Sequence, residues 1–403
     1  MKPPTRTELP VVVAGGGIGG LAAALALVRQ GYRVTVLEQA PEIGEIGAGI
    51  QLGPNAFHAF DALGVGDKAR GRAVYTEAMV MHDAIDESLV GRIETGEAFR
   101  QRFGNPYAVI HRADVHLSLL EAAQESGRVS FHTHTRVQRV EQDEARQTVT
   151  AVDQQGTRWE GQALIGADGG KSVVREQYVN DPPRVTGHVV YRAVVDKADF
   201  PQDLQWNAAS LWAGPKCHLV HYPLRGGEQY NVVVTFHSRQ QETWGVTDGS
   251  KAEVESYFQG ISPKARQLIE LPKTWKRWAT ADREPIGHWV FGRATLLGDA
   301  AHPTTQYMAQ GACMALEDAV TLGEALRTTQ HHWDAALPLY QEQRVARTAR
   351  IVLSGREMGR LYHAAGVERL VRNALWKGRT QERFYDAIEW LYGWNVNNCL
   401  QQA

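Results

Sequence analysis

The chain of 403 residues has 43 lysines and arginines against 45 aspartates and glutamates, a formal net charge of -2. This balance gives no electrostatic argument for a nucleic-acid partner, and the length suffices for two or three domains with a large core. The three cysteines, Cys217, Cys313 and Cys399, are odd in number and lack CxxC spacing, which argues against a disulfide framework and a zinc site. We predict no metal ion and a reducing, cytoplasmic location.

The chain begins with a strand, a glycine-rich turn, a helix and a second strand. The apolar run Val11–Ala14 predicts a buried strand, the alanine- and leucine-rich helix ends at Gly31, and the second strand runs over Val34–Leu37. The long uncharged run superficially resembles a signal peptide, but its many glycines would break the apolar helix of such a signal. We therefore expect neither export nor a membrane span.

The turn between the first strand and the helix carries the spacing GxGxxG at Gly15, Gly17 and Gly20. The first glycine makes the tight turn, the second lets the backbone approach a pyrophosphate, and the third lets the helix pack on the strand. Glu38 ends the second strand, where a carboxylate can accept both hydroxyls of an adenosine ribose. Together these features predict a dinucleotide site.

The rest of the chain predicts an α/β fold with an inserted domain. Residues 109–127 read as a strand and a helix, the segments over 129–170 alternate with period two, and residues 187–239 are almost all strand. Residues 250–270 are helical, 294–300 return to a buried strand, and the chain from Gly311 onward is mostly helical. We expect a Rossmann-like nucleotide-binding domain (1–180 and 285–330), an inserted, mostly antiparallel β-sheet substrate domain (181–284) and a C-terminal helical region (331–403).

Two further segments identify the nucleotide. "LIGADGGKSVVR" (164–175) carries Asp168 and Arg175, and "ATLLGDAAHP" (294–303) carries Asp299. In order and spacing, these segments and GxGxxG resemble the FAD-site motifs of the single-component (group A) aromatic flavoprotein monooxygenases, and the resemblance covers nearly the whole chain. It implies a p-hydroxybenzoate hydroxylase-like fold, tightly bound FAD, NADH as co-substrate, dioxygen as oxidant and a homodimer.

The resemblance also implies roles for single residues. Glu38 would hold the adenosine ribose, Arg112 would lie along the FAD and Asp299 would bind the ribityl chain, whereas the segment with Asp168 and Arg175 serves both FAD and NAD(P)H in this family. In relatives, the loop after GDAAHP runs beside the isoalloxazine ring, and the next helix points its N-terminus at N1 and the C2 carbonyl. Free N–H groups near three residues would there stabilise the negative charge of reduced flavin, namely Gln310, Gly311 and Ala312.

Three polar side chains are candidates for the substrate site. Gln306 stands where most relatives of the family have a proline, and its amide supplies a donor and an acceptor to a polar group of the substrate. In "KCHLVHYPL", strand geometry places His218, Val220 and Tyr222 on one face. A neutral imidazole can take a phenolic proton near neutral pH. The alternative is that His218 and Tyr222 are half-exposed on an outer face of the sheet.

"HLVHY" together with "TTQYMAQG" resembles the branch of the family that hydroxylates 3-hydroxybenzoate para to its phenol. The product in that branch is 2,5-dihydroxybenzoate (gentisate), and the reaction passes through a flavin C4a-hydroperoxide. The resemblance therefore implies a role in the catabolism of aromatic compounds. The resemblance implies that His218 is the base or phenolate acceptor, that Gln306 holds the phenolic oxygen and that Tyr222 orients it. Two alternatives stay open: a decarboxylating hydroxylation of salicylate or 6-hydroxynicotinate, and a non-catalytic flavoprotein.

Outside these motifs we expect structural roles. His302 shapes the turn after the strand at 294–300, and Glu317 and Asp318 lie on the solvated face of their helix. The aromatic segment "FYDAIEWLYGWNVNNC" near the end of the chain is expected to pack in the core.

Overall fold

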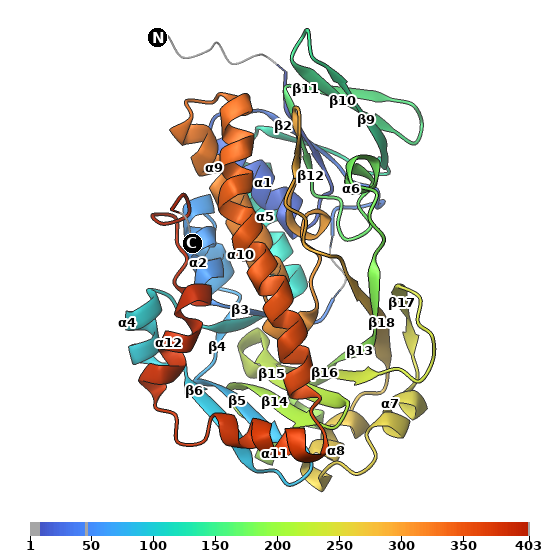
Figure 1. Cartoon of the computed structure of the whole chain (residues 1–403), viewed down its shortest axis with the longest axis vertical. Helices are drawn as coiled ribbons and strands as arrows, with labels where there is room; N and C mark the ends of the chain where they lie inside the picture. The colour runs from blue at the N-terminus through green and yellow to red at the C-terminus, as the bar shows by residue number, and fades with distance from the viewer. Residues whose placement is uncertain (1–8, 45–46, 402–403) are drawn as a thin grey trace.

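The computed structural model describes residues 9–44 and 47–401 as an elongated molecule with a sheet towards each end (Figure 1). The sheet nearer the N-terminus has the order β19-β20-β12-β1-β2-β8, with β1 parallel to both β2 and β12. It therefore combines the start, the middle and the return segment of the chain, as the sequence predicts. Its strands are β1 (Val11–Ala14), β2 (Val34–Leu37), β8 (Val129–His132), β12 (Ala163–Gly166), β19 (Val290–Phe291) and β20 (Ala294–Leu296).

Helices cover this sheet because its central strands β1, β2 and β12 are buried on both faces. All four residues of β1 and of β2 are buried, and α1 buries its alanines and leucines against the sheet and α9. A small sheet of β9, β10 and β11 extends this end of the molecule. These elements are α1 (Ile18–Arg29), α2 (Pro54–Leu63), α3 (Gly66–Arg70), α5 (Arg112–Glu125), α6 (Val173–Tyr178), α9 (Gly311–Thr328), β9 (Val137–Asp143), β10 (Thr148–Asp153) and β11 (Arg158–Gly161).

The second large sheet has eight strands in the order β17-β18-β13-β16-β15-β14-β5-β6. Most of it is antiparallel, but β14 pairs with β5 in parallel, and β5 and β6 come from residues 78–94. The sheet thus includes two strands from the 1–180 segment that the sequence patterns assign to the nucleotide-binding domain. Its strands are β5 (Ala78–Asp83), β6 (Leu89–Glu94), β13 (Arg184–Asp196), β14 (Ala208–Gly214), β15 (Cys217–Leu224), β16 (Gln229–His237), β17 (Gly245–Gly249) and β18 (Trp275–Asp282).

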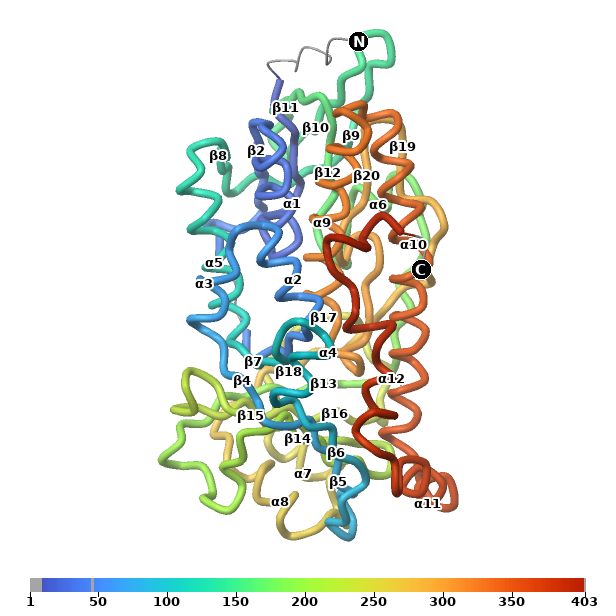
Figure 2. Tube along the Cα trace, turned by 90° about the vertical axis from the view of Figure 1, so that its left-hand side faces the viewer, coloured from blue at the N-terminus to red at the C-terminus, as the bar shows by residue number. Residues whose placement is uncertain are grey.

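One face of the second sheet packs on α7 and α8 around its own apolar core; the other face turns towards the first sheet. A three-stranded sheet in the order β3-β7-β4 lies between the two ends (Figure 2). The elements are α7 (Lys251–Tyr257), α8 (Pro263–Glu270), β3 (Gly49–Leu52), β4 (Val74–Tyr75) and β7 (Ala108–His111).

The long helix α10 (Trp333–Tyr362) runs from one large sheet to the other, and α11 (Gly366–Leu375) and α12 (Gln381–Tyr392) follow it (Figures 1 and 2). Helix α12 packs on α4 (Glu97–Phe103) and β6, and its Phe384 and Tyr392 are buried, which confirms the expected core packing of the aromatic segment. In residues 9–44 and 47–401, no helix combines the length and the apolarity that a membrane crossing requires.

The expectation that Glu317 and Asp318 face solvent is wrong. Both carboxylates are fully buried, because α9 is enclosed by α1, α2 and α10 and has no solvated face at this point. Arg344 on α10 donates to Glu317 (2.7 Å) and to Asp318 (2.6 Å), and Asp318 also pairs with His302 (2.6 Å). Burial alone would raise the pKa of Asp318, but His302 and Arg344 lower it to about 2.

We predict that Arg344→Met lowers the free energy of unfolding by about 3–5 kcal/mol, because it removes the cation that Glu317 and Asp318 share and leaves the two buried carboxylates with Arg347 on Glu317 and His302 on Asp318. The measurement is urea unfolding followed by tryptophan fluorescence, with Arg327→Met as the control, since Arg327 pairs with Glu324 at the surface. Because folding lowers the pKa of Asp318, its contribution is complete above about pH 4 and is lost as the pH falls towards about 2. Equal small effects of the two substitutions would contradict this account.

Candidate active site

A cavity of about 1510 Å³ extends from the glycine turn, past the N-terminus of α9, to the inner face of the eight-stranded sheet. Of the residues named for the site from the sequence, all line it except Gly20 and Arg175. A further apolar branch runs between β5, β6 and α12. The sequence motifs therefore meet in one continuous space, although they come from widely separated parts of the chain.

A side chain is excluded at Gly15 and Gly20 by different close contacts, and Gly17 has a different role. Gly15 has a left-handed backbone (φ +105°), and a Cβ atom there would lie 2.3 Å from the carbonyl oxygen of Ala167. A Cβ on Gly20 would lie 1.9 Å from the carbonyl oxygen of Gly15, so Gly20 allows α1 to pack on the turn without itself reaching the cavity. Gly17 caps α1 and lines the cavity, which opens the helix N-terminus to an anionic group.

At the end of β2, Glu38 is held in place by the backbone. Its carboxylate accepts the N–H of Gly16 (2.7 Å) and of Ala40 (2.8 Å) and lines the cavity. Arg112, the first residue of α5, lies on the cavity wall as well. A carboxylate beside a glycine turn, together with a guanidinium, suits the ribose and pyrophosphate of a dinucleotide.

In the 164–175 segment, Asp168 faces the cavity, whereas Arg175 has a structural role. Asp168 lines the cavity and accepts the N–H of Val173 (2.8 Å) at the start of α6. Arg175 is fully buried and donates to the carbonyl oxygens of Ala300 (3.2 Å) and Ala301 (2.6 Å). Arg175 therefore ties the 164–175 segment to the 294–303 segment.

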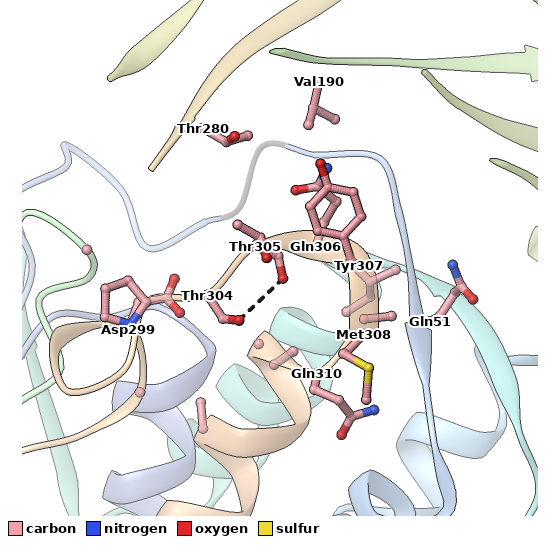
Figure 3. Close-up of a pocket in the computed structure, with 18 of the residues that line it drawn as sticks. Gln51, Val190, Thr280, Asp299, Thr304, Thr305, Gln306, Tyr307, Met308 and Gln310 are labelled. Atoms are coloured by element: carbon pink, nitrogen blue, oxygen red, sulfur yellow. Dashed lines mark hydrogen bonds between the residues drawn. The ribbon is translucent and has the colours of Figure 1, made fainter. Parts of the chain in front are cut away.

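The loop that follows β20 forms the wall nearest the start of α9. Figure 3 shows Thr304, Thr305, Gln306, Tyr307 and Met308 along this wall, with Val190 and Thr280 of the large sheet opposite them. Asp299 lies at the start of the loop with an exposed side chain.

Helix α9 begins at Gly311, with Gln310 as its cap and Ala312 also on the cavity wall. The Gln310 side-chain oxygen accepts the amide N–H of Asn55 (2.9 Å). The first N–H groups of a helix have no partner within it and carry partial positive charge. With a ribose-binding carboxylate at one end and these donors at the other, the residues fit an elongated dinucleotide such as FAD.

Strand β15 alternates as the sequence predicts. His218, Val220 and Tyr222 line the cavity, whereas Cys217 and Leu219 pack in the core on the opposite face. His218 and Tyr222 are each 2% exposed, so the alternative of a half-exposed outer face is wrong. A Cβ on Gly49 would lie 2.5 Å from the Tyr222 ring, which shows how closely β3 approaches this face.

Gln306 reaches the same face of the sheet from the loop. Its amide nitrogen donates to the hydroxyl of Thr235 (3.3 Å), and Thr235 is the register partner of His218 across β15 and β16. The structure therefore brings the predicted pair His218 and Gln306 to neighbouring positions, 88 residues apart in sequence, where both can contact one small ligand.

A cluster of imidazoles behind His218 is absent from the sequence prediction. His218 Nδ1 lies 2.7 Å from His363 Nε2, and His363 Nδ1 lies 3.0 Å from His237 Nε2. His188 bonds to the Tyr307 hydroxyl. The nearest ring nitrogens of His188, His237 and His363 lie within 4.8 Å of one another.

The sequence signal for this cluster was weak, because His363 follows α10 and is 145 residues from His218. Only the register of β13 with β16, which pairs His188 with His237, could have indicated part of it. Burial, reinforced by His188, lowers the pKa of His218 to about 3, and burial with the neighbouring imidazoles lowers that of His363 far below its ordinary value. These imidazoles are therefore neutral at pH 7.

Arg192 is a further residue that the sequence interpretation missed. It lies on β13 and lines the cavity, on the same sheet face as Val220, with Val233 between them in register. Its guanidinium lies 5.5 Å from the centre of the Trp278 ring. The cavity wall that carries His218 and Tyr222 thus also carries a cation.

Comparison with known proteins agrees with this geometry. Residues 8–354 match the model of the FAD binding domain family. The chain is 80% identical over 393 residues to "3-hydroxybenzoate 6-hydroxylase" of Polaromonas naphthalenivorans (strain CJ2), covering 98% of both chains. It is 63% identical to "3-hydroxybenzoate 6-hydroxylase" of Klebsiella oxytoca, covering 97% of this chain and 98% of the relative.

Among solved structures, Klebsiella pneumoniae HpxO complexed with FAD and uric acid superposes with a TM-score of 0.83 at 27% identity, covering 99% of both chains. The likeness therefore extends over both sheets and the helical region. The chain belongs to the FAD binding domain family and is a flavoprotein monooxygenase of the p-hydroxybenzoate hydroxylase-like fold.

Proposed function

We propose that this flavoprotein hydroxylates 3-hydroxybenzoate para to its phenol to give gentisate, with NADH as reductant. The observation that carries the proposal is the convergence of His218 and Gln306 on one face of the cavity, through Thr235, beside the start of α9. The names of the relatives support the choice of substrate.

The two halves of the cavity have different tasks in this proposal. Gly15, Gly17, Glu38, Arg112 and Asp299 would hold FAD, and the N-terminus of α9 would face its ring. The bound flavin supplies the reductive activation of dioxygen, which no side chain could provide. The sheet residues would bind the aromatic ring, orient it and control its phenolic proton.

His218 would act on the phenol through Nε2, because its Nδ1 is engaged by His363. Removal of the phenolic proton raises electron density at the carbon para to the oxygen, which is the position to be hydroxylated. Gln306 would hydrogen-bond the same oxygen, and Tyr222 would orient the ring. Burial raises the pKa of Tyr222, so its hydroxyl stays protonated as a donor.

Arg192 would bind the substrate carboxylate. It is one step along the sheet from the His218–Thr235 row, since β13 places Val190 opposite Thr235 and Arg192 opposite Val233. Successive positions on one face of a strand are about 6.6 Å apart, and neighbouring strands are about 4.8 Å apart. With β16 between β13 and β15, the backbones of Arg192 and His218 are therefore roughly 12 Å apart, a distance that the two side chains and a ring with a phenol and a carboxylate at meta positions can bridge together. The guanidinium can hold a carboxylate through two hydrogen bonds.

We also propose a homodimer, a cytoplasmic location, and the division of the chain into FAD-binding, substrate-binding and C-terminal segments given above, with β5 and β6 added to the substrate sheet. The free, buried state of all three cysteines supports the reducing compartment.

The proposed reaction predicts that purified holoenzyme converts 3-hydroxybenzoate and NADH to gentisate with retention of the carboxylate. Chromatography of the product and detection of carbon dioxide from carboxyl-labelled substrate measure both features. A decarboxylating hydroxylation of salicylate or 6-hydroxynicotinate would release labelled carbon dioxide from those acids. Turnover of either acid with no gentisate from 3-hydroxybenzoate would overturn the proposed substrate.

We predict that Gln306→Ala slows hydroxylation roughly three- to tenfold while FAD stays bound, because one neutral hydrogen bond contributes about 0.5–1.5 kcal/mol. Gln306→Glu should be slower still, since a carboxylate repels the phenolate that it faces. Gentisate formed per NADH and the FAD content are the measurements, with the exposed Gln124→Glu as a control for the added charge. A Gln306→Glu variant with the parent yield would place the side chain away from the phenol.

Arg192→Gln should weaken binding of 3-hydroxybenzoate roughly tenfold to a hundredfold, because a hydrogen bond to a charged group contributes about 1.5–3 kcal/mol. Binding of 3-hydroxybenzamide, which lacks the negative charge, should change little, and Arg192→Lys should retain part of the affinity. Titration of the flavin absorbance gives each Kd. If both ligands weaken equally, Arg192 supports the sheet and does not bind the carboxylate.

A further inference from the structure

Three hydrogen-bonded imidazoles connect the substrate cavity with the surface. His218 lines the cavity and is 2% exposed, His363 is 6% exposed, and His237 is exposed at the end of β16. Their ring nitrogens are joined at 2.7 Å and 3.0 Å, each bond using the Nδ1 of one ring and the Nε2 of the next. Each imidazole thus has one nitrogen towards the cavity and one towards solvent.

A neutral imidazole carries a single N–H, so the donors along such a row must all point the same way. In one arrangement they point outwards: His218 Nδ1–H donates to His363, His363 Nδ1–H donates to His237, and His218 Nε2 is free to accept a proton. In the other arrangement every proton sits on Nε2, and His218 Nε2–H donates into the cavity. The two arrangements differ by the passage of one proton through the row.

We propose that His218, His363 and His237 form a proton relay between the substrate phenol and solvent, an inference that rests on the proposed function. The phenolic proton moves to His218 Nε2, the Nδ1 proton of His218 to His363 Nε2, the Nδ1 proton of His363 to His237 Nε2, and the Nδ1 proton of His237 to water. The phenol becomes a phenolate, one proton enters the solvent, and every imidazole stays neutral.

The relay also runs in reverse. When the oxygenated ring becomes aromatic again, its oxygen regains a proton from His218 Nε2–H, and the row returns to the outward arrangement. In that step His237 Nδ1 takes one proton from water, and the ring carbon releases its own hydrogen as a proton to water, so rearomatisation neither consumes nor releases a net proton.

The groups around the three imidazoles keep them neutral, so a proton that enters the row is passed on and does not stay on one ring. Burial keeps the pKa of His218 at about 3, and burial with Lys216 lowers that of His237, so neither ring keeps a proton near pH 7. The other groups facing the row are His188 from β13, Tyr307 from the loop after β20 and Tyr362 at the end of α10. Burial raises the pKa of both tyrosines and lowers that of His188 to about 4. All three neighbours are therefore neutral at pH 7.

The test uses holoenzyme and the variant His237→Gln. The amide nitrogen of glutamine lies near the position of Nε2 and can still hydrogen-bond His363, but an amide does not pass a proton from one side to the other. Stopped-flow mixing with 3-hydroxybenzoate, read by a pH-indicator dye and by the phenolate absorbance, should show proton release slowed about tenfold or more. The exposed His332→Gln, at the cap of α10, is the matched control and should behave as the parent.

Addition of free imidazole to the variants distinguishes a proton relay from a structural role of His237 and His363. It should restore the rate in His237→Gln, because it can reach the exposed end of the row, but not in His363→Gln, whose defect is buried. FAD content reports on folding in each variant. Parent-like proton release in both His237→Gln and His363→Gln, with release lost in His218→Gln, would overturn the relay but leave the base assignment intact. Parent-like release in His218→Gln would overturn that assignment and the relay with it.

Discussion

The active site depends on a buried ionic cluster in which Glu317 pairs with Arg344 and Arg347, and Asp318 pairs with Arg344 and His302. Asp318 accepts the N–H of Gly298 (3.0 Å) and pairs with His302, which fixes both ends of the 298–302 turn against α9. Arg344 joins α9 to α10 through both carboxylates. One group of charges therefore fixes the positions of the loop after β20, the start of α9 and α10 relative to one another.

The consequences extend along both helices. Towards the flavin, the Asn55 amide donates hydrogen bonds to Glu317 and to Gln310 (2.9 Å). Asn55 thus connects the cap of α9 to the ionic cluster. Towards the substrate, α10 runs to the inner face of the eight-stranded sheet, and His363 follows directly after it (Figure 1). A cluster that neither ligand touches thus positions residues on both sides of the cavity. Such buried charges are costly to desolvate, and their complete pairing here is what makes them compatible with the core.

Local signals in the sequence identified the parts of the site that local structure builds. The turn at Gly15 and Gly20 and the alternation around His218 follow from steric and periodic rules that act over a few residues. The pairing of β5 with β14 joins residues about 130 positions apart, and no pattern within 78–94 specifies that partner. The burial of Glu317 and Asp318 depended on arginines one helix further along the chain, and the role of His363 depended on where α10 ends. These contacts exist only once the whole chain is folded.

The central claim is that the phenolic oxygen of the substrate lies between His218 and Gln306, with the carboxylate at Arg192. The most direct measurement is a crystal structure of the FAD holoenzyme with 3-hydroxybenzoate. The account predicts a distance of about 2.6–3.2 Å between the phenolic oxygen and His218 Nε2, with the carbon para to that oxygen facing the flavin ring. A ring bound in the opposite sense, with its carboxylate at His218 and its phenol at Arg192, would contradict it.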